Sequence, residues 1–305
     1  MPDIILHHYE ASPFAELARV ALGMKKLRWR SVIIPNMMPK PDLVELTGGY
    51  ARTPVLQIDA EIYCDTAAIL GALEAFQPNP SFYPAPLGSL HRMIAGWTGS
   101  GQFAAHVGAA MRNVPPDILG PGFAADRKRR FVGFDFDMMP VVAPHLETQV
   151  IAAADWLEDV LSDGRSFIGG DLPGHGDLGL YMNLWFLSAL PFAQAFAESV
   201  FSRAKLLAWF NRIRDIGHGD VVNSTSEEAI AIAAAAAPVD LAGPVEAGQS
   251  VGQMVMIRTE QSGDEPVSGK LLRCGTGGIT IRRESGRAGQ VNVHFPRIGQ
   301  IVLPG

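Results

Sequence analysis

Two neighbouring stretches carry the strongest structural signal in the chain: Ala51–Asp59 (ARTPVLQID) and Cys64–Ile69 (CDTAAI). Thr53–Pro54 leads into a short apolar run with a β-branched start, which favours a strand. A turn and a second short run, Glu61–Tyr63, complete a predicted hairpin. Asp65 stands directly before an apolar run, where its side chain can cap a helix. The two stretches therefore predict a strand, a turn, a second strand and a helix.

Outward from this point, the first part of the chain alternates strands and helices. Ile4–His8 predicts a strand, and apolar residues at helical spacing follow Pro13, a residue suited to a first helical turn. Trp29–Ile34 alternates and indicates a second strand, and a short helix is expected over residues 39–46. The resulting order, β-α-β-α-β-β-α, is that of a thioredoxin-like domain, which we assign to residues 1–78.

A proline-rich linker follows, and the pattern then becomes helical, so that residues 87–236 are predicted to form an all-helical domain. The predicted helices span residues 90–111, 141–161, 177–189, 192–202 and 204–216. Between them, a Pro/Gly-rich stretch holds the basic cluster Arg127–Arg130. A solvated helix end is the favoured interpretation of this cluster, and an anion site is the alternative.

Beyond a second linker the periodicity changes to two. Five short strands separated by glycine turns are predicted at residues 251–258, 269–273, 279–283, 291–295 and 300–303. This spacing indicates a small β-barrel-like domain over residues 247–305, with no recognisable chemistry. The fold class is therefore α+β multidomain.

Composition excludes several classes of function. The chain has 305 residues with a net charge of −6, which argues against a nucleic-acid binder because such proteins need cations to neutralise phosphates. Its two cysteines, Cys64 and Cys274, are far apart and show no metal-ligand spacing. The first residues show no basic, signal-like region, and the longest apolar stretch, residues 178–192, is short for a membrane span. We expect a cytoplasmic protein with no metal, nucleic-acid or membrane partner.

Three motifs together resemble the cytosolic glutathione S-transferase family, over roughly residues 3–215. Ser12–Arg19 resembles the segment after the first strand in omega- and tau-type transferases. Thr53–Val55 followed by Asp65–Ile69 resembles the family's Val-Pro and Glu-Ser-x-Ala-Ile elements. Phe167–Asp177 resembles the folding motif that opens the central helix of the helical domain. The resemblance implies a glutathione-binding thioredoxin-like domain and an all-helical domain.

The resemblance also assigns the glutathione contacts. Pro54 is expected in the cis form, with the backbone of Thr53 pairing with the cysteinyl part of glutathione. Thr66 would hold the γ-glutamyl carboxylate at a helix N-terminus, and Asp65 the amine. The family more often has Glu or Gln followed by Ser at these two positions, so this contact departs from the usual pattern.

Ser12 is the first candidate for activating the sulfur, and Tyr9 is the alternative. A hydroxyl that donates to the sulfur favours the thiolate, because hydrogen bonding to the charged form lowers a pKa. The helix that begins beside Ser12 acts in the same direction. The simpler interpretation is that Ser12 only caps that helix.

The substrate pocket is expected between the two domains. The residues proposed to line it are Trp97, Phe103, His106 and Met37, with the segment 115–122 nearby. These side chains suggest a small hydrophobic electrophile, although such stripes are often plain core. The resemblance also implies a homodimer.

The sequence thus predicts a glutathione transferase-like enzyme with glutathione as co-substrate. One alternative is a non-catalytic scaffold that binds glutathione or a protein, since fold does not fix function. Another is a glutathione-dependent peroxidase, isomerase or ether-cleaving enzyme that uses the same site.

Overall fold

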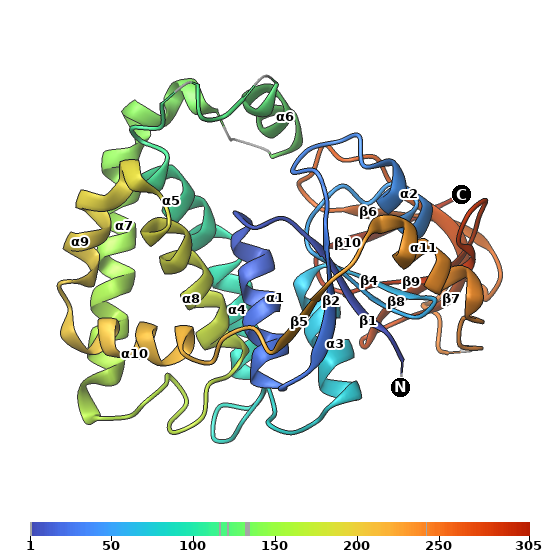
Figure 1. Ribbon diagram of the computed structural model, residues 1–305, viewed down its shortest axis with the longest axis horizontal. Coiled ribbons are helices and arrows are strands. Elements are labelled where there is room, and N and C mark those ends of the chain that lie inside the picture. Colours follow the sequence, from blue (N-terminus) through green and yellow to red (C-terminus); the bar gives the residue numbers. More distant parts are fainter. Residues whose placement is uncertain (1, 116, 121, 132–134, 242) are drawn as a thin grey trace.

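The computed structural model describes residues 2–115, 117–120, 122–131, 135–241 and 243–305. Helices gather on one side of the molecule and a long mixed sheet fills the other, with α1 and α3 between them (Figure 1). The predicted segment 115–122 therefore lies partly outside the described residues, because positions 116 and 121 are not among them.

The thioredoxin-like order at the start of the chain is confirmed. Its elements are β1 (Ile4–His8), α1 (Pro13–Met24), β2 (Arg28–Ile33), α2 (Pro41–Thr47), β3 (Val55–Ile58), β4 (Glu61–Cys64) and α3 (Thr66–Phe76). β1 runs parallel to β2 and antiparallel to β3, which pairs with β4. The hairpin and the helix after it are those predicted.

The helical part follows, also as predicted in outline. It consists of α4 (Leu90–Thr98), α5 (Gly101–Ala110), α6 (Phe123–Arg130), α7 (Met139–Val160), α8 (His175–Ser188), α9 (Gln194–Phe201) and α10 (Ala204–Arg214). The single helix predicted over residues 90–111 is corrected to two. The break falls at Gly99 and Ser100, and Ser100 has non-helical backbone angles of φ −118 and ψ −104. A glycine beside a residue that bonds its own backbone weakens a helix at that point.

The prediction of an all-helical unit up to residue 236 is wrong beyond α10. There the chain returns to the sheet and forms β5 (Asp220–Asn223), which pairs parallel with β2. α11 (Ser226–Ala235) is capped by Thr225 and Glu228 and packs on α2. A four-residue edge strand is too short to show a period of its own, so the alanine-rich helix after it resembled a continuation of the helical part.

The five predicted C-terminal strands are confirmed. They are β6 (Met254–Thr259), β7 (Val267–Gly275), β8 (Gly278–Ser285), β9 (Gly289–Phe295) and β10 (Gln300–Pro304). The expectation of a barrel of their own is corrected, because β9 pairs parallel with β4 and one sheet runs in the order β10-β6-β7-β8-β9-β4-β3-β1-β2-β5. Without β9, β4 would be an edge strand with unpaired backbone groups.

The two faces of this sheet belong to two cores. Successive strand residues point to opposite faces, so Ile4 and Leu6 of β1 pack with α1, α3 and the helical part, whereas Ile5 packs on the other side. That second core also contains residues of α2, α11 and β6 to β9. The C-terminal strands therefore share a core with the first domain.

A buried polar cluster joins β4 to β9. The Glu61 carboxylate accepts hydrogen bonds from the Val239 N–H, at 2.8 Å, from the Asn292 amide, at 2.9 Å, and from Nε2 of His294, at 2.6 Å. Nδ1 of His294 is 3.0 Å from the Thr280 hydroxyl. In the described part of the chain, all hydrogen-bond donors to this carboxylate lie in the C-terminal segment, so Glu61 connects the first hairpin to that segment.

Among the residues that the structure describes, no single helix is long and apolar enough to cross a membrane. α8 and Pro191–Phe201 pass that test only as a pair, bent by 94°.

Candidate functional site

The N-terminus of α3 forms the first part of the site. Asp65 precedes the helix and its Oδ1 accepts the Ala67 N–H at 2.9 Å. Asp65 has φ +80, a backbone conformation that is unusual for a residue other than glycine and that concentrates at functional positions. Burial raises the pKa of Asp65, while the Ala67 N–H and the Arg52 charge oppose this. Thr66 is the first helical residue, so N–H groups of the first turn face outward from the helix end.

Thr53 and Pro54 form the second part, directly before β3. Their peptide bond is cis, which confirms the expectation for Pro54. Neither the Thr53 N–H nor its C=O takes part in a hydrogen bond of the turns and loops that the structure describes. The β1–β3 register reaches Val55 and stops short of Thr53. The Thr53 backbone is therefore open to an extended ligand.

Lys40 is a residue of this site that sequence reasoning missed. Its Nζ donates to the Thr53 hydroxyl at 2.9 Å and to the Ala51 C=O at 3.0 Å, and only 1% of the residue is exposed. Burial lowers the pKa of Lys40 to about 7, with a further contribution from the charges of Arg130 and Arg127. In the sequence, Lys40 stands between two prolines before a short helix, and nothing there distinguishes it from a solvated lysine.

Ser12 and Tyr9 lie at the turn between β1 and α1. Oγ of Ser12 accepts the Ala15 N–H at 3.2 Å, so the capping interpretation is correct for this side chain. Ser12 is 2% exposed, and its O–H remains a donor, because capping uses only an oxygen lone pair. Tyr9 is half-buried and its C=O accepts the Ser12 N–H at 3.2 Å.

Of the predicted pocket residues, the structure brings only some toward this site. Phe103 on α5 packs against Phe14, two residues after Ser12, with ring centroids 4.7 Å apart. His106 is buried; its Nδ1 donates to the Gln102 C=O, and burial lowers its pKa to about 4, so it is neutral near pH 7. Met37 lies half-buried in the loop after β2.

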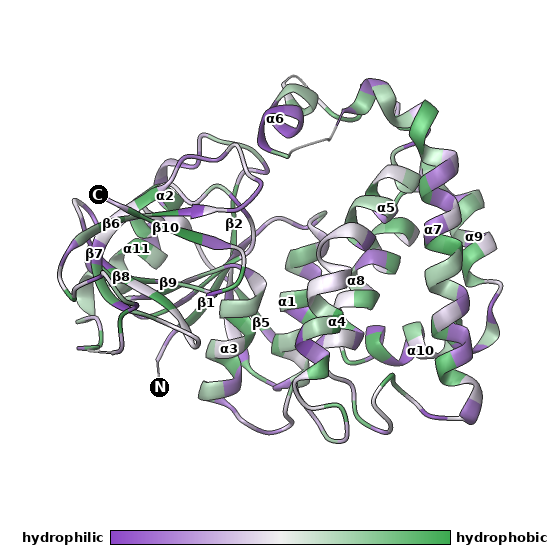
Figure 2. Ribbon diagram, turned by 180° about the vertical axis from the view of Figure 1, so that it is seen from behind, coloured by the Kyte–Doolittle hydropathy of each residue, from purple (hydrophilic) through white to green (hydrophobic). Residues whose placement is uncertain are grey.

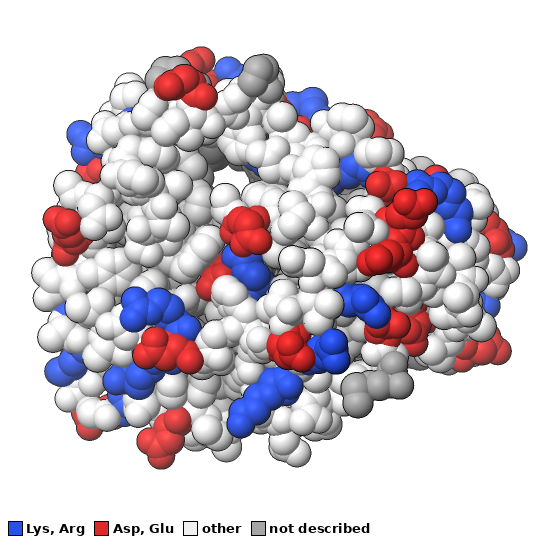
Figure 3. Space-filling view, in the orientation of Figure 1, with Lys and Arg blue, Asp and Glu red and all other residues white. Residues whose placement is uncertain are grey.

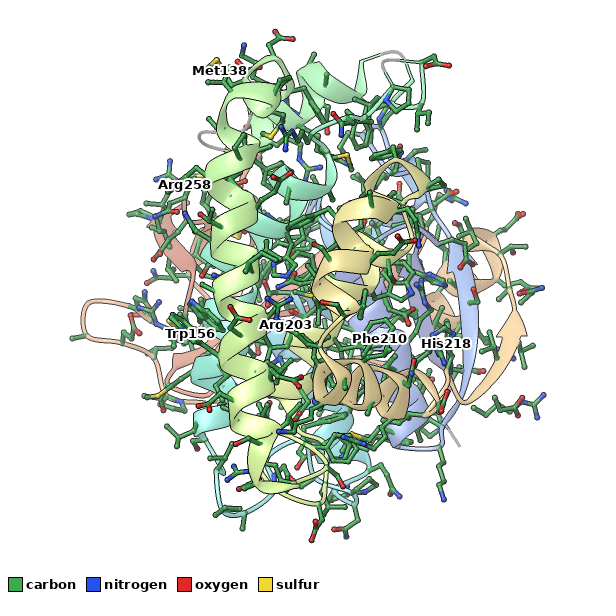
Figure 4. All side chains as sticks on the ribbon, turned by 90° about the vertical axis from the view of Figure 1, so that its left-hand side faces the viewer. Met138, Trp156, Arg203, Phe210, His218 and Arg258 are labelled. Atoms are coloured by element: carbon green, nitrogen blue, oxygen red, sulfur yellow. The ribbon has the colours of Figure 1, made fainter. Side chains whose placement is uncertain are left out.

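Trp97 does not lie on the same pocket wall as Phe103. Its ring stacks on Trp156 of α7, with centroids 6.1 Å apart, and Trp156 is 63% exposed (Figure 4). Trp97 therefore belongs to an outer face of α4 and α7. The sequence spacing of Trp97 and Phe103 suggested one face, but the break between α4 and α5 separates them.

The basic cluster lies on α6, and only half of it is solvated. Lys128 and Arg129 are exposed, as the solvated interpretation requires, whereas Arg127 is 9% and Arg130 2% exposed. Arg130 forms an ion pair with Asp264, in the loop between β6 and β7, at 2.6 Å. The segment that resembled a plain helix end thus connects the helical part to the C-terminal strands.

Two surface hollows, of about 540 and 630 Å³, lie elsewhere, around Pro80 and the end of α1. The residues that line these two hollows include none of the residues described above for this site. Among the described residues, no group of three or more His, Cys, Asp or Glu side chains could hold a metal ion.

Comparisons with known proteins agree with this geometry. A family profile described as "Glutathione S-transferase, N-terminal domain" matches residues 6–81, and one described as "Glutathione S-transferase, C-terminal domain" matches residues 140–212. Among solved structures, a GST-like protein from Pseudomonas syringae is 36% identical, with 100% of both chains covered and a TM-score of 0.81. The chain therefore belongs to the glutathione S-transferase family.

More distant structures share the fold. A tau class glutathione S-transferase from mango is 17% identical, covering 72% of this chain and 94% of that chain with a TM-score of 0.51. A poplar glutathione transferase F1 mutant is 12% identical, covering 70% and 92% with a TM-score of 0.53. The comparison with curated proteins found no match.

Proposed function

We propose that this protein binds glutathione along Thr53 and the start of α3 and uses its thiolate to attack an electrophile. The observation that carries the proposal is the open Thr53 backbone between two groups that attract carboxylates, the α3 N-terminus and the Lys40 ammonium. Glutathione is an extended tripeptide with a carboxylate at each end, so these three features match its backbone and both of its carboxylates.

The fit of each part follows from the contacts. The γ-glutamyl carboxylate would accept N–H groups at the start of α3, and Asp65 would bind the amine beside it. The cysteinyl unit would pair with Thr53, which directs the glycyl carboxylate toward Lys40. A carboxylate next to Lys40 would restore the protonated ammonium, whose pKa is about 7 in the free protein.

Ser12 would then stabilise the thiolate, with Tyr9 as the rival donor. A hydrogen bond to a charged group contributes roughly 1.5–3 kcal/mol. Since one pKa unit corresponds to about 1.4 kcal/mol, such a bond lowers a thiol pKa from about 8.5 by roughly one to two units. That shift would bring the pKa of the bound thiol to roughly 6.5–7.5, so that about a quarter to three quarters of it would be thiolate at pH 7.

A second candidate function is a non-catalytic binding protein on the same scaffold. The observation that favours it is the burial of Ser12, whose hydroxyl already caps α1. If Ser12 acts only as a cap, the site binds glutathione without activating it. A peroxidase, isomerase or ether-cleaving reaction would require the same thiolate as conjugation. It would therefore also depend on Ser12 or Tyr9 to stabilise that thiolate.

The test is a calorimetric titration of glutathione, followed by ultraviolet titration of the bound thiol. We expect Thr66→Ala to weaken glutathione binding about 10-fold, as expected for one lost hydrogen bond to a charge. Thr148→Ala, an exposed threonine on α7, is the matched control. Ser12→Ala should raise the bound thiol pKa by roughly one to two units if Ser12 donates, and Tyr9→Phe should do so if Tyr9 does. Absence of binding at millimolar glutathione would contradict the proposal.

The wider setting is also part of the proposal. The Phe14–Phe103 wall supports a small hydrophobic electrophile, and the two free, buried cysteines are compatible with a reducing cytoplasm.

The outer face of α4 and α7 supports a homodimer, because several large apolar side chains are exposed there. They are Leu90, Met93, Trp97, Trp156 and Val160. Light scattering should show a dimer that Met93→Glu converts to a monomer; a monomeric wild type would refute this part.

A further inference from the structure

α6 forms an arch over the proposed glutathione site. Beyond α6, Phe131 makes a β-bridge with Ser262, and the Gly263 N–H donates to the Arg130 C=O at 3.1 Å. On the other side, Nη2 of Arg127 donates to the Asn36 C=O, in the loop after β2, at 2.9 Å. Figure 1 shows α6 above the β1–α1 turn, and Figure 3 shows the surface hollowed beneath it. α6 is thus fixed to both parts of the sheet around the site.

α6 is largely hydrophilic (Figure 2). The buried charges around it are unbalanced. Four largely buried cations meet there: Lys40, Arg52, Arg127 and Arg130. Three carboxylates face them: Asp264, Asp126 and Asp65, the last of which is within electrostatic range of Arg52. Asp264 is shared by Arg130 and Arg52, and Asp126 is shared by Arg127, Arg129 and Arg130. A buried charge without a partner is costly, so the excess of cations favours an anion at this place.

Arg127 has unused hydrogen-bond donors. A guanidinium has five N–H donors, and in the described part of the chain Arg127 uses one toward Asp126 and one toward Asn36. Its side chain is 11% exposed, and it lies over the Phe123 ring at 4.3 Å and the Phe131 ring at 5.9 Å. The two rings limit the side chain's freedom and leave its remaining donors for a ligand.

Arg127 and Arg130 lie near the place proposed for the glutathione sulfur as well as near the place proposed for its peptide backbone. Arg127 and Arg130 are within electrostatic range of both the Tyr9 phenol and the Lys40 ammonium. Tyr9 stands at the turn that holds Ser12, where the sulfur of bound glutathione would be. An anion beside Arg127 would therefore lie next to the reacting sulfur.

We infer that α6 provides an anion-binding wall on which the electrophilic second substrate places a carboxylate, with Arg127 as its main donor. The inference rests on the proposed function and narrows its substrate class to an apolar or aromatic electrophile that carries a carboxylate. The Phe14–Phe103 wall takes the apolar body, and Arg127 binds the carboxylate through paired N–H groups.

The chlorodinitrobenzoate anion is a suitable probe, with its methyl ester as the uncharged counterpart. The thiol proton passes to solvent, and the sulfur electron pair forms the new C–S bond at the ring carbon that bears chlorine. Chloride then leaves with the electron pair of the C–Cl bond. The product is a glutathione conjugate with a benzoate group, and the same product can be synthesised and titrated without turnover.

The experiment titrates three ligands into the full chain by calorimetry: glutathione, the benzoate conjugate and the methyl ester conjugate. We expect the benzoate conjugate to bind at least 10-fold more tightly than the ester conjugate. In Arg127→Gln that preference should disappear while glutathione affinity changes less than twofold, since the amide still has a donor for the Asn36 C=O. Lys128→Gln, an exposed neighbour on α6, is the matched control and should retain the preference. Thermal unfolding of each variant confirms that it is folded.

The outcomes separate this inference from the proposed function. If glutathione binds and the two conjugates bind equally, the anion wall is refuted and the glutathione site stands. If Arg127→Gln weakens glutathione as much as the benzoate conjugate, the arginine serves a carboxylate of glutathione and the inference is also refuted. If glutathione itself does not bind, both fail together. Loss of the benzoate preference with added salt, alongside an unchanged ester affinity, would support a charge interaction.

Discussion

Two of the contacts between the C-terminal strands and the rest of the molecule differ in their chemistry. At β4–β9 the contact is a backbone ladder, with Ile62 opposite Val293 and the buried Glu61 cluster beside it. At α6 the contact consists of side-chain charges around Asp264, one short β-bridge and the Arg130 backbone. The first contact lies beside a core of apolar residues, and the second overhangs the proposed site.

This difference in chemistry assigns two separate roles to the C-terminal strands, one in the fold and one at the proposed site. Backbone pairing beside an apolar core opens only when the structure unfolds. A small polar contact can open locally, because the free energy of that opening is lower than the free energy of unfolding. The C-terminal strands are therefore part of the fold through β9 and part of the site through Asp264. This comparison can be tested at each contact separately.

The largest effect is expected at the β4–β9 contact. Glu61→Ala removes the acceptor of the Val239, Asn292 and His294 donors, of which the Asn292 and His294 side chains are buried. The free energy of unfolding should fall by about 3 kcal/mol, measured by chemical denaturation, since each unsatisfied buried group costs about 1–3 kcal/mol.

The control is Glu284→Ala on β8, whose carboxylate accepts only the exposed Gln290 amide among the described contacts. Its free energy of unfolding should change by less than about 0.5 kcal/mol. Equal losses in the two variants would mean that the Glu61 cluster has no special part in the fold.

A smaller and local effect is expected at the α6 contact. Asp264→Asn removes the charge that Arg130 and Arg52 share, which should make the α6 amides exchange roughly 10- to 100-fold faster. Amides of β8 and β9 should keep their protection in hydrogen-exchange mass spectrometry. Glu265→Gln, an exposed neighbour, is the control. Faster exchange throughout the sheet would show that the two contacts are one cooperative unit.

The last effect is a dependence of stability on pH and concerns Lys40, which faces Arg127, Arg130, Asp126 and Asp264. Its pKa is about 7 in the folded state and 10.5 ordinarily. Between these values the unfolded chain binds more protons, so stability should rise with pH, by at most about 1.4 kcal/mol per pH unit. Lys40→Met should flatten this rise in denaturation measured from pH 7 to 10, and Lys205→Met, at an exposed position, should not. An unchanged slope in Lys40→Met would assign the rise to other groups.

The sequence predicted individual helices and strands better than it predicted which strands pair with one another. The order β1 to α3 and the five C-terminal strands follow from local patterns, namely alternation, caps and turn residues, whereas the cis peptide before Pro54 is implied by the family resemblance. That β9 would pair with β4 could not be predicted, because pairing depends on which edge is free after folding, and both strands are short and apolar.

The same limit applies to the site. Thr53, Asp65 and Thr66 come from one continuous motif, so a resemblance could point to them, although their roles stay predictions. Lys40, Arg127 and Arg130 assemble across distant segments, and a charged residue in a sequence usually indicates a solvated surface. The burial of Lys40, Arg127 and Arg130 depends on the position of α6 in the folded structure, which the sequence does not predict.

The pairing of β4 with β9 also has a consequence for synthesis. The first hairpin leaves the ribosome long before its partner, since Glu61 pairs with Asn292. The edge of β4 stays uncovered while most of the chain is made, and contacts of such sequence separation form late. A nascent chain that stalls before β9 would expose that edge to a second nascent chain. We expect the nascent chain to benefit from a chaperone that shields an emerging strand, because strands translated much later complete the domain that was translated first.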